Sequence, residues 1–179
     1  MTPDYTKLWE TCVLDDGVVD NFKIYFNTIY LNQNRYKKVT ILTSVPWKLI
    51  AALHFRESSL SFRGCLHNGD PLYRPTTHVP KGRGPFATWE ESAVDALMMD
   101  KEHFPVEWTV PAQLHFAEKF NGYGYRRTSE LSPYVWAYTN HHDETGKYVA
   151  DGRYSATAIE KQLGVAAIIK GIDELMRAT

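Results

Sequence analysis

The 179-residue sequence lacks the features that mark several common protein classes. Basic and acidic residues nearly balance, at 20 against 21, so no excess of positive charge indicates a nucleic-acid partner. No apolar run approaches the roughly 20 residues that a membrane-spanning helix needs. The first residues, Met1–Tyr5, contain no basic segment followed by an apolar one, so no signal peptide is expected. The composition is that of a globular protein, and the length favours one domain over two.

Cysteines and metal-binding motifs are also scarce. The two cysteines, Cys12 and Cys65, allow one disulfide or none, and both alternatives stay open. The seven histidines form no His-Glu-x-x-His string, and neither cysteine belongs to a set with zinc spacing, so we expect no metal and no other cofactor. No Gly-x-Ser-x-Gly elbow is present, so a serine nucleophile is not expected.

The most informative segment is an amphipathic helix, expected at residues 44–60, with a carboxylate on its apolar face. One helical stripe joins Glu57 to four apolar residues, Pro46, Ile50, Leu53 and Leu60. Burial and the negative end of the helix dipole both disfavour the anion, so the Glu57 carboxyl group is expected to keep a proton near neutral pH, as a general acid must. The alternative is a glutamate that turns to water or pairs with Arg56 or Arg63.

Apolar periodicity predicts a mainly α fold. In the N-terminal third we expect helices over residues 20–31 and 36–42, and Ser44 and Pro46 suit the N-cap and first turn of the helix at 44–60. Three more helices are expected: one opened by the Thr88–Glu91 capping box, one starting at Thr109 or Val110 and ending at Gly122, and one starting near Ser155 or Thr157 and running through Ile168. Residues 64–88, with four glycines and four prolines, predict a long loop or a small hairpin.

A second helix end is rich in hydrogen-bonding groups. Asn121 ends the predicted helix, and Gly122 and Gly124 let the backbone approach a ligand closely. Tyr123 and Tyr125 add phenol groups. Such a helix end suits a polar, ring-shaped substrate, and the alternative is an Asn-Gly turn without a ligand.

These two helix ends, in this order, resemble those of the lysozyme-like superfamily, in particular the goose-type lysozymes and soluble lytic transglycosylases. In those enzymes one helix ends in a catalytic Glu followed by Ser, and a later helix ends in an aromatic-Asn-x-Gly segment that lines the sugar groove. The matching segments here are Arg56–Ser59 and Phe120–Gly124. Further blocks resemble a group of bacterial and phage-associated members: Leu66–Leu72, Trp89–Ala93, Ser132–Trp136 and Gly146–Gly152. The Gly-Leu-Met-Gln-like segment of the better-known transglycosylases is missing.

The resemblance implies a single lysozyme-like helical domain over residues 1–179, with the Gly/Pro-rich loop or small hairpin between the helix of Glu57 and the second half. It implies a glycosidase that cleaves the β-1,4 bond between N-acetylmuramic acid and N-acetylglucosamine in peptidoglycan. Glu57 is then the residue that protonates the glycosidic oxygen. Such an enzyme acts on the cell wall, in the periplasm, outside the cell or after delivery by a phage. Separately from the resemblance, we expect a monomer.

The mechanism depends on a second carboxylate. A hydrolase needs one as a base or nucleophile, whereas a lytic transglycosylase uses a neighbouring sugar hydroxyl instead. Asp70 is the preferred second catalytic residue, with an Asp-Pro turn as the alternative, and Glu90 and Asp95 are weaker candidates. The expected substrate-binding residues are Asn68, Asn121, Tyr123, Tyr125 and Tyr148.

Three alternatives stay open. His54 lies one turn before Glu57 and either tunes its proton affinity or belongs to the core. A protein of this fold can also be a non-catalytic glycan-binding module or a structural part of a phage. The same acid would equally serve an enzyme that cleaves chitin.

Overall fold

The computed structural model describes residues 2–127, 130–142, 145–150 and 153–178. These residues are mainly helical and contain a two-stranded antiparallel sheet, so the mainly α class is confirmed. The chain divides into two compact units: unit 1 is Met1–Phe26 with Pro105–Thr179, and unit 2 is Asn27–Phe104. The single domain implied by the resemblance stays a prediction. Over the described ranges, no helix combines the length and the hydropathy that crossing a membrane requires.

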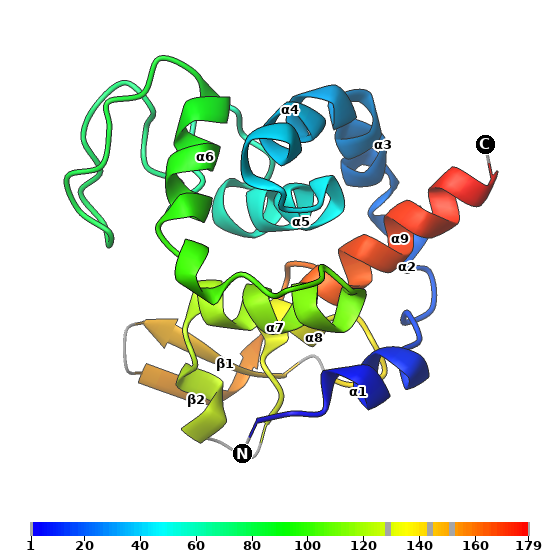
Figure 1. Cartoon of the computed structure of the whole chain (residues 1–179). Helices are drawn as coiled ribbons and strands as arrows, with labels where there is room; N and C mark the ends of the chain where they lie inside the picture. The colour runs from blue at the N-terminus through cyan, green and yellow to red at the C-terminus, as the bar shows by residue number, and fades with distance from the viewer. Residues whose placement is uncertain (1, 128–129, 143–144, 151–152, 179) are drawn as a thin grey trace. The chain divides into compact units, whose positions relative to one another are not determined.

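Unit 2 is built around a buried helix. Its elements are most of α3 (Lys23–Leu31), then α4 (Gln33–Thr43), α5 (Trp47–Ser58), α6 (Trp89–Met98) and the 3₁₀ turn η1 (Lys101–His103). Helix α4 packs against both α5 and α6 (Figure 1). Every side chain from Leu49 to Phe55 is buried, so α5 is covered on all sides, as is typical of a core helix. The predicted inward stripe of α5 is therefore correct at Ile50 and Leu53.

The predicted N-cap of α5, Ser44, is wrong by two residues, because the N-cap is Pro46. Ser44 does not cap α5; it ends α4 in a left-handed conformation, with φ 65°, and its N–H donates to the carbonyl oxygen of Thr40. Pro46 is extended and precedes α5, which begins at Trp47. The reason is that a proline disfavours helical geometry in the residue before it, so α4 and α5 must be separated at Val45.

Of the two structures predicted for residues 64–88, a long loop or a small hairpin, the structure has the loop, and it contains no regular strand. Within this loop, Gly64 and Pro71 form an isolated antiparallel β-bridge. The hairpin lies elsewhere, in unit 1, where β1 (Thr145–Ala150) pairs with β2 (Arg153–Ile159). The predicted helix start at Ser155 or Thr157 is therefore wrong, because aromatic and β-branched residues of this segment pair with β1.

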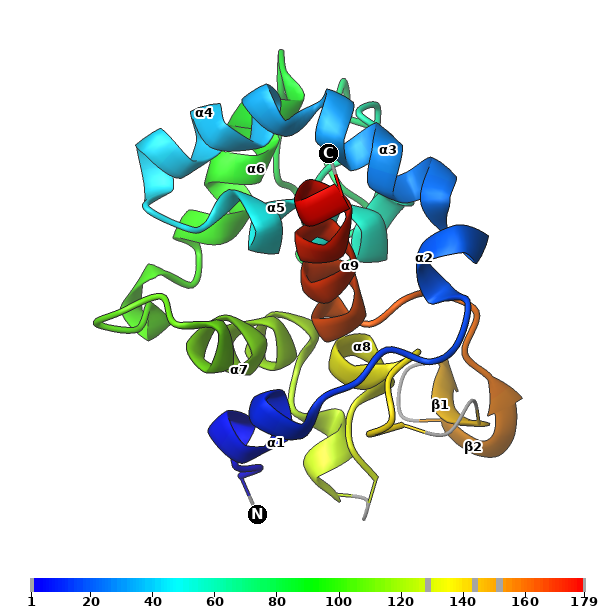
Figure 2. The ribbon, with the colours of Figure 1, turned by 90° about the vertical axis from the view of Figure 1, so that its right-hand side faces the viewer.

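Unit 1 contains the remaining helices, which are α1 (Tyr5–Thr11), α2 (Val18–Asn21), α7 (Val110–Asn121), η2 (Gly124–Arg127), α8 (Pro133–Trp136) and α9 (Val165–Ala178). Helix α1 packs on α7, and α8 packs on both α7 and α9 (Figure 2). A Cβ at Gly164 would lie 2.5 Å from the carbonyl oxygen of Val135. Only a glycine can therefore stand where the chain passes α8 and enters α9.

Each unit contains one cysteine, and both thiols are buried and free. Cys12 lies in unit 1 and Cys65 in unit 2. Burial raises the pKa of both thiols above its ordinary value, so both stay protonated at neutral pH. Of the two alternatives, the chain has no disulfide between them.

Candidate functional site

Glu57 lies in the last turn of α5, where its side chain is partly buried. The helix stops one residue later because Ser59 and Leu60 both adopt left-handed backbone conformations, with φ of 50° and 65°. The N–H of Ser59 donates to the carbonyl oxygen of Phe55 at 2.9 Å, which closes the helix end. The carboxylate is therefore attached to a well-packed support and lies near the negative end of the helix dipole.

The loop at residues 64–70 packs on this helix end through its backbone. A Cβ on Gly69 would lie 2.5 Å from the carbonyl oxygen of Glu57, and the φ of Gly69 is +76°, so the position requires glycine. The loop is closed by hydrogen bonds from the Cys65 N–H to the Asp70 carbonyl oxygen, at 2.6 Å, and from the Gly69 N–H to the Cys65 carbonyl oxygen, at 2.9 Å. A compact turn thus lies directly against the backbone of the helix end that carries Glu57.

Asp70 organises the next part of the loop. Its Oδ2 accepts hydrogen bonds from the backbone N–H groups of Thr77 and His78, at 2.7 and 2.9 Å, and its Oδ1 lies 2.7 Å from Nδ1 of His78. Burial alone would raise the pKa of Asp70, but these hydrogen bonds outweigh it and lower the pKa to about 2. Asp70 is therefore an anion whose two oxygens hold the loop, and its catalytic role stays a prediction.

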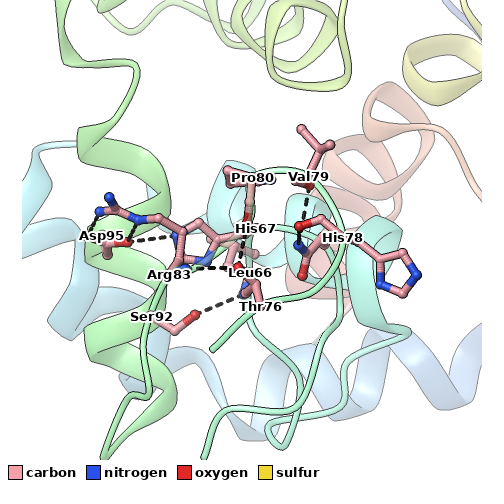
Figure 3. Close-up of polar contacts among 10 residues, drawn as sticks. Leu66, His67, Thr76, His78, Val79, Pro80, Arg83, Ser92 and Asp95 are labelled. Carbon is pink, nitrogen blue, oxygen red and sulfur yellow. Dashed lines mark hydrogen bonds and ion pairs between the residues drawn. The ribbon is translucent and has the colours of Figure 1, made fainter. Parts of the chain in front are cut away.

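Asn68 is also bonded within the loop. Its Nδ2 donates to the carbonyl oxygens of His78 and Val79, at 3.1 and 3.3 Å, and its Oδ1 accepts from the Asp70 N–H at 3.0 Å. Figure 3 labels His78 and Val79 and marks the contacts of their carbonyl oxygens with dashed lines. A sugar bound by this amide must compete with the loop for it.

The two weaker candidates for a second carboxylate are in ion pairs. Glu90 accepts two hydrogen bonds from Arg35, at 2.7 and 2.9 Å, and these lower its pKa. Asp95 accepts from Arg83 Nε at 2.8 Å and lies 2.8 Å from Nε2 of His67 (Figure 3). Burial raises the pKa of Asp95, but these partners outweigh it and lower the pKa. Each carboxylate therefore holds a basic side chain in place through an ion pair.

His54 is a core residue. Its ring is fully buried among Tyr36, Phe62 and Trp89, with centroid distances of 5.9, 4.6 and 4.4 Å. Its Nδ1 lies 3.0 Å from the hydroxyl of Tyr36. Desolvation by burial lowers the pKa of His54 to about 4, so the ring is neutral at pH 7. This environment agrees with the core alternative for His54.

Two of the predicted substrate-binding tyrosines come together in unit 1. The rings of Tyr125 and Tyr148 lie 5.0 Å apart in an edge-to-face arrangement, and the Tyr148 N–H donates to the hydroxyl of Tyr125 at 3.0 Å. The Tyr148 hydroxyl donates to the carbonyl oxygen of Gly124 at 3.3 Å. Tyr154 on β2 lies beside them, with its ring centroid 5.5 Å from that of Tyr148. The sequence analysis missed Tyr154 because it assigned that segment no strand.

Tyr123 belongs to a second cluster. The guanidinium carbon of Arg126 is 3.6 Å from the centroid of the Tyr123 ring, and the Tyr123 hydroxyl lies 3.4 Å from Nε2 of His115. Asn121 is exposed at the end of α7. The predicted site residues thus form one set in unit 2, around Glu57, and another set in unit 1.

Glu118 is a buried acid that the sequence analysis did not select. It lies on α7 with an exposed fraction of 3%, and its Oε2 accepts from the hydroxyl of Tyr5 and from Nε and Nη2 of Arg126, at 3.2 and 2.9 Å for the two nitrogens. Burial raises the pKa of Tyr5, and the contact with Glu118 adds to this rise. The signal was present, because Leu114 lies one turn earlier on the buried face of the same helix.

Neither a metal-ligand cluster among the described residues nor a related protein was found. Within the residues that the structure describes, no three side chains of His, Cys, Asp or Glu come together as metal ligands. Comparisons of the chain with protein-family models, with curated proteins and with solved structures found no match.

Proposed function

We propose that the chain cleaves peptidoglycan glycan strands at the β-1,4 bond between N-acetylmuramic acid and N-acetylglucosamine, with Glu57 as the general acid. The observation that carries the proposal is the setting of Glu57: a partly buried residue in the last turn of a buried helix, with the backbone of Gly69 packed against the backbone carbonyl of Glu57. A catalytic acid needs such a fixed support. The resemblance of Arg56–Ser59 and Phe120–Gly124 to the lysozyme-like motifs adds to it.

Glu57 acts by giving its proton to the glycosidic oxygen as the bond to the anomeric carbon breaks. This step requires Glu57 to carry the proton beforehand, as a general acid must. After the step, Glu57 is a carboxylate that can take a proton from the attacking hydroxyl. One residue can therefore serve as acid and then as base.

The lytic transglycosylase route is favoured over hydrolysis by one observation. The three other candidate carboxylates of unit 2, Asp70, Glu90 and Asp95, are each bonded to partners that hold the structure. A hydrolase needs a second carboxylate near the acid, as base or nucleophile. A transglycosylase needs Glu57 alone, because a hydroxyl of the muramic acid residue attacks its own anomeric carbon and gives an anhydro end.

Turbidity of a purified cell-wall suspension tests the proposal. The native chain should clear the suspension, and Glu57→Gln should lower the rate at least about a hundredfold, because the amide cannot donate the proton that general acid catalysis requires. Glu102→Gln is the matched control, since its side chain is 81% exposed in the same unit, and it should clear like the native chain. A folded Glu57→Gln variant with native activity would refute the proposal. A native chain that binds walls without clearing them is a binding or structural module.

Mass spectrometry of the released fragments separates the two routes. Anhydro ends are lighter than reducing ends by one water, and we expect them to dominate. Asp70→Asn should keep most of the clearing rate if it folds. Reducing ends, together with a folded but inactive Asp70→Asn variant, would instead assign hydrolysis with Asp70 as the second catalytic carboxylate. Chitin in the same assay tests whether the muramic acid residue is required.

A further inference from the structure

Unit 1 contains a cavity of about 420 Å³ whose described lining residues all belong to unit 1. The N-terminal segment, α7, η2 and the residues before and within α8 supply its lining, which includes Tyr5, Glu118, Arg126, Ser132 and Trp136. This volume lies within the range of small-molecule sites. The cavity is therefore large enough for a ligand of the size of a monosaccharide or a short aliphatic molecule.

The carboxylate of Glu118 is satisfied on one oxygen. All three donors that the structure gives it, from Tyr5 and Arg126, reach Oε2. Oε1 accepts no hydrogen bond from the described residues. A carboxylate offers about four lone-pair positions, so Oε1 is available to a donor that enters the cavity.

Ser132 adds a second unsatisfied group to the same lining. Its exposed fraction is 4%, and its Oγ has no hydrogen-bond partner within the described part of the chain. Buried hydroxyl groups are nearly always bonded, and those that are not call for an explanation. A hydroxyl can rotate about χ1, so a ligand in the cavity could supply the missing partner.

The charges around the cavity favour a cation. The lining residues that the structure describes include three acids, Asp4, Glu118 and Glu130, and one arginine. Arg126 is engaged on all sides: Nε and Nη2 bond Glu118, Nη1 lies 3.4 Å from the hydroxyl oxygen of Thr2, and its plane covers a tyrosine ring. Among the described lining residues, an anionic ligand would therefore find no uncommitted cation, whereas a cation meets acids and aromatic walls.

We infer that this cavity binds a primary ammonium group, carried by an amino sugar or by an aliphatic amine. The ammonium donates hydrogen bonds to Oε1 of Glu118 and to Oγ of Ser132, and the body of the ligand lies against Tyr5 and Trp136. The site does not involve Glu57. It goes beyond the proposed glycan cleavage and does not depend on it.

Binding to the full chain is tested by ¹H–¹⁵N NMR at pH 7 and constant ionic strength, with the Trp136 indole signal as the reporter. The probes are D-glucosamine and n-butylamine, and their neutral counterparts are N-acetylglucosamine and 1-butanol. At least one ammonium probe should shift the indole signal saturably, and the neutral compounds should not. Saturation by glucosamine alone identifies an amino sugar, and saturation by butylamine alone identifies an aliphatic amine. Shifts that do not saturate, or equal shifts from the neutral compounds, would overturn the inference.

Variants test the assigned contacts. Glu118→Gln should weaken ammonium binding about tenfold or more, because it removes a charge-assisted hydrogen bond. Glu107→Gln, an exposed glutamate of the same unit, should bind like the native chain. A folded Glu118→Gln variant with native affinity contradicts the inference. If Glu118→Gln does not fold, Ser132→Ala decides, because its Oγ has no described bond to lose: binding at least about threefold weaker supports the site, and unchanged binding overturns it. Glu57→Gln should bind normally, so a failed clearing assay leaves this result intact.

Discussion

The loop that carries Asp70 and the cluster that carries Glu118 each bury a carboxylate, but they use its oxygens differently. Both oxygens of Asp70 are bonded to Thr77 or His78, seven and eight residues along the chain. Only Oε2 of Glu118 has described donors, and one of them, Tyr5, is 113 residues away in sequence. A carboxylate with all its oxygens bonded organises a loop, whereas one with an oxygen left over joins distant segments and can also receive a ligand.

The largest effect should come from removing the shared partner in unit 1. Glu118→Ala leaves Arg126 without its carboxylate and the Tyr5 hydroxyl without an acceptor, so we expect the free energy of unfolding to fall by about 3 kcal/mol. Urea denaturation measures this loss. Glu107→Ala, at an exposed position of the same unit, should change it by less than about 0.5 kcal/mol. A similar small change for both variants would show that the cluster contributes little to stability.

A pair of glycines tests how tightly the Asp70 loop lies on α5. Gly69 and Gly82 share a φ of +76°, but a Cβ at Gly69 meets the Glu57 carbonyl oxygen at 2.5 Å, and a Cβ at Gly82 meets nothing within 4 Å. Gly82→Ala should cost about 1 kcal/mol, from backbone conformation alone. Gly69→Ala should cost at least about 2 kcal/mol, because a steric clash adds to this strain. Equal losses of unfolding free energy would mean that the loop does not pack on the helix end.

Asp70→Asn tests whether the carboxylate organises its loop. The amide keeps one acceptor but places an N–H₂ group against donors, so we expect a loss of about 2 kcal/mol in the free energy of unfolding. Limited proteolysis within residues 76–83 should become faster. Asp16→Asn, at an exposed site, should leave both measurements unchanged. Native protease resistance in Asp70→Asn would contradict the assigned role.

The smallest effect concerns pH. The pKa of Asp70 is about 2 in the folded chain, against an ordinary value of 3.8, so the unfolded chain takes up the proton first as the pH falls. The stabilisation is complete above pH 4 and is lost as the pH falls through about 2. The difference in unfolding free energy between the native chain and Asp70→Asn should therefore narrow between pH 4 and pH 2. A difference that stays constant over this range would show that the Asp70 charge does not contribute.

The sequence predicted those parts of the fold that depend on neighbours along the chain. Thr88 and Thr109 cap α6 and α7 as expected, since a cap bonds an N–H only a few residues ahead. Periodicity placed Ile50 and Leu53 of α5 on an inward stripe, and both are buried, although the side chains between them are buried as well. Glu57 could be selected for the same reason, because its position on that stripe is a local property.

The features that were missed depend on contacts between distant residues. The β2 strand is recognisable only once residues 145–150 are known to pair with it. Glu118 acquires its role from Tyr5, and Asp70 acquires its role from the fold of an irregular loop. No local pattern encodes these donors, because periodicity describes which face of an element is buried and not which partner covers it.

The two unpaired cysteines have a practical consequence. Cys12 and Cys65 are shielded by different halves of the chain, so a thiol-alkylating reagent reaches each sulfur only when its own half opens. Peptide mapping after timed alkylation would then yield two separate opening rates from one sample, without any introduced label. Equal alkylation rates at the two cysteines would indicate that the two units open together, and different rates would indicate that they open independently.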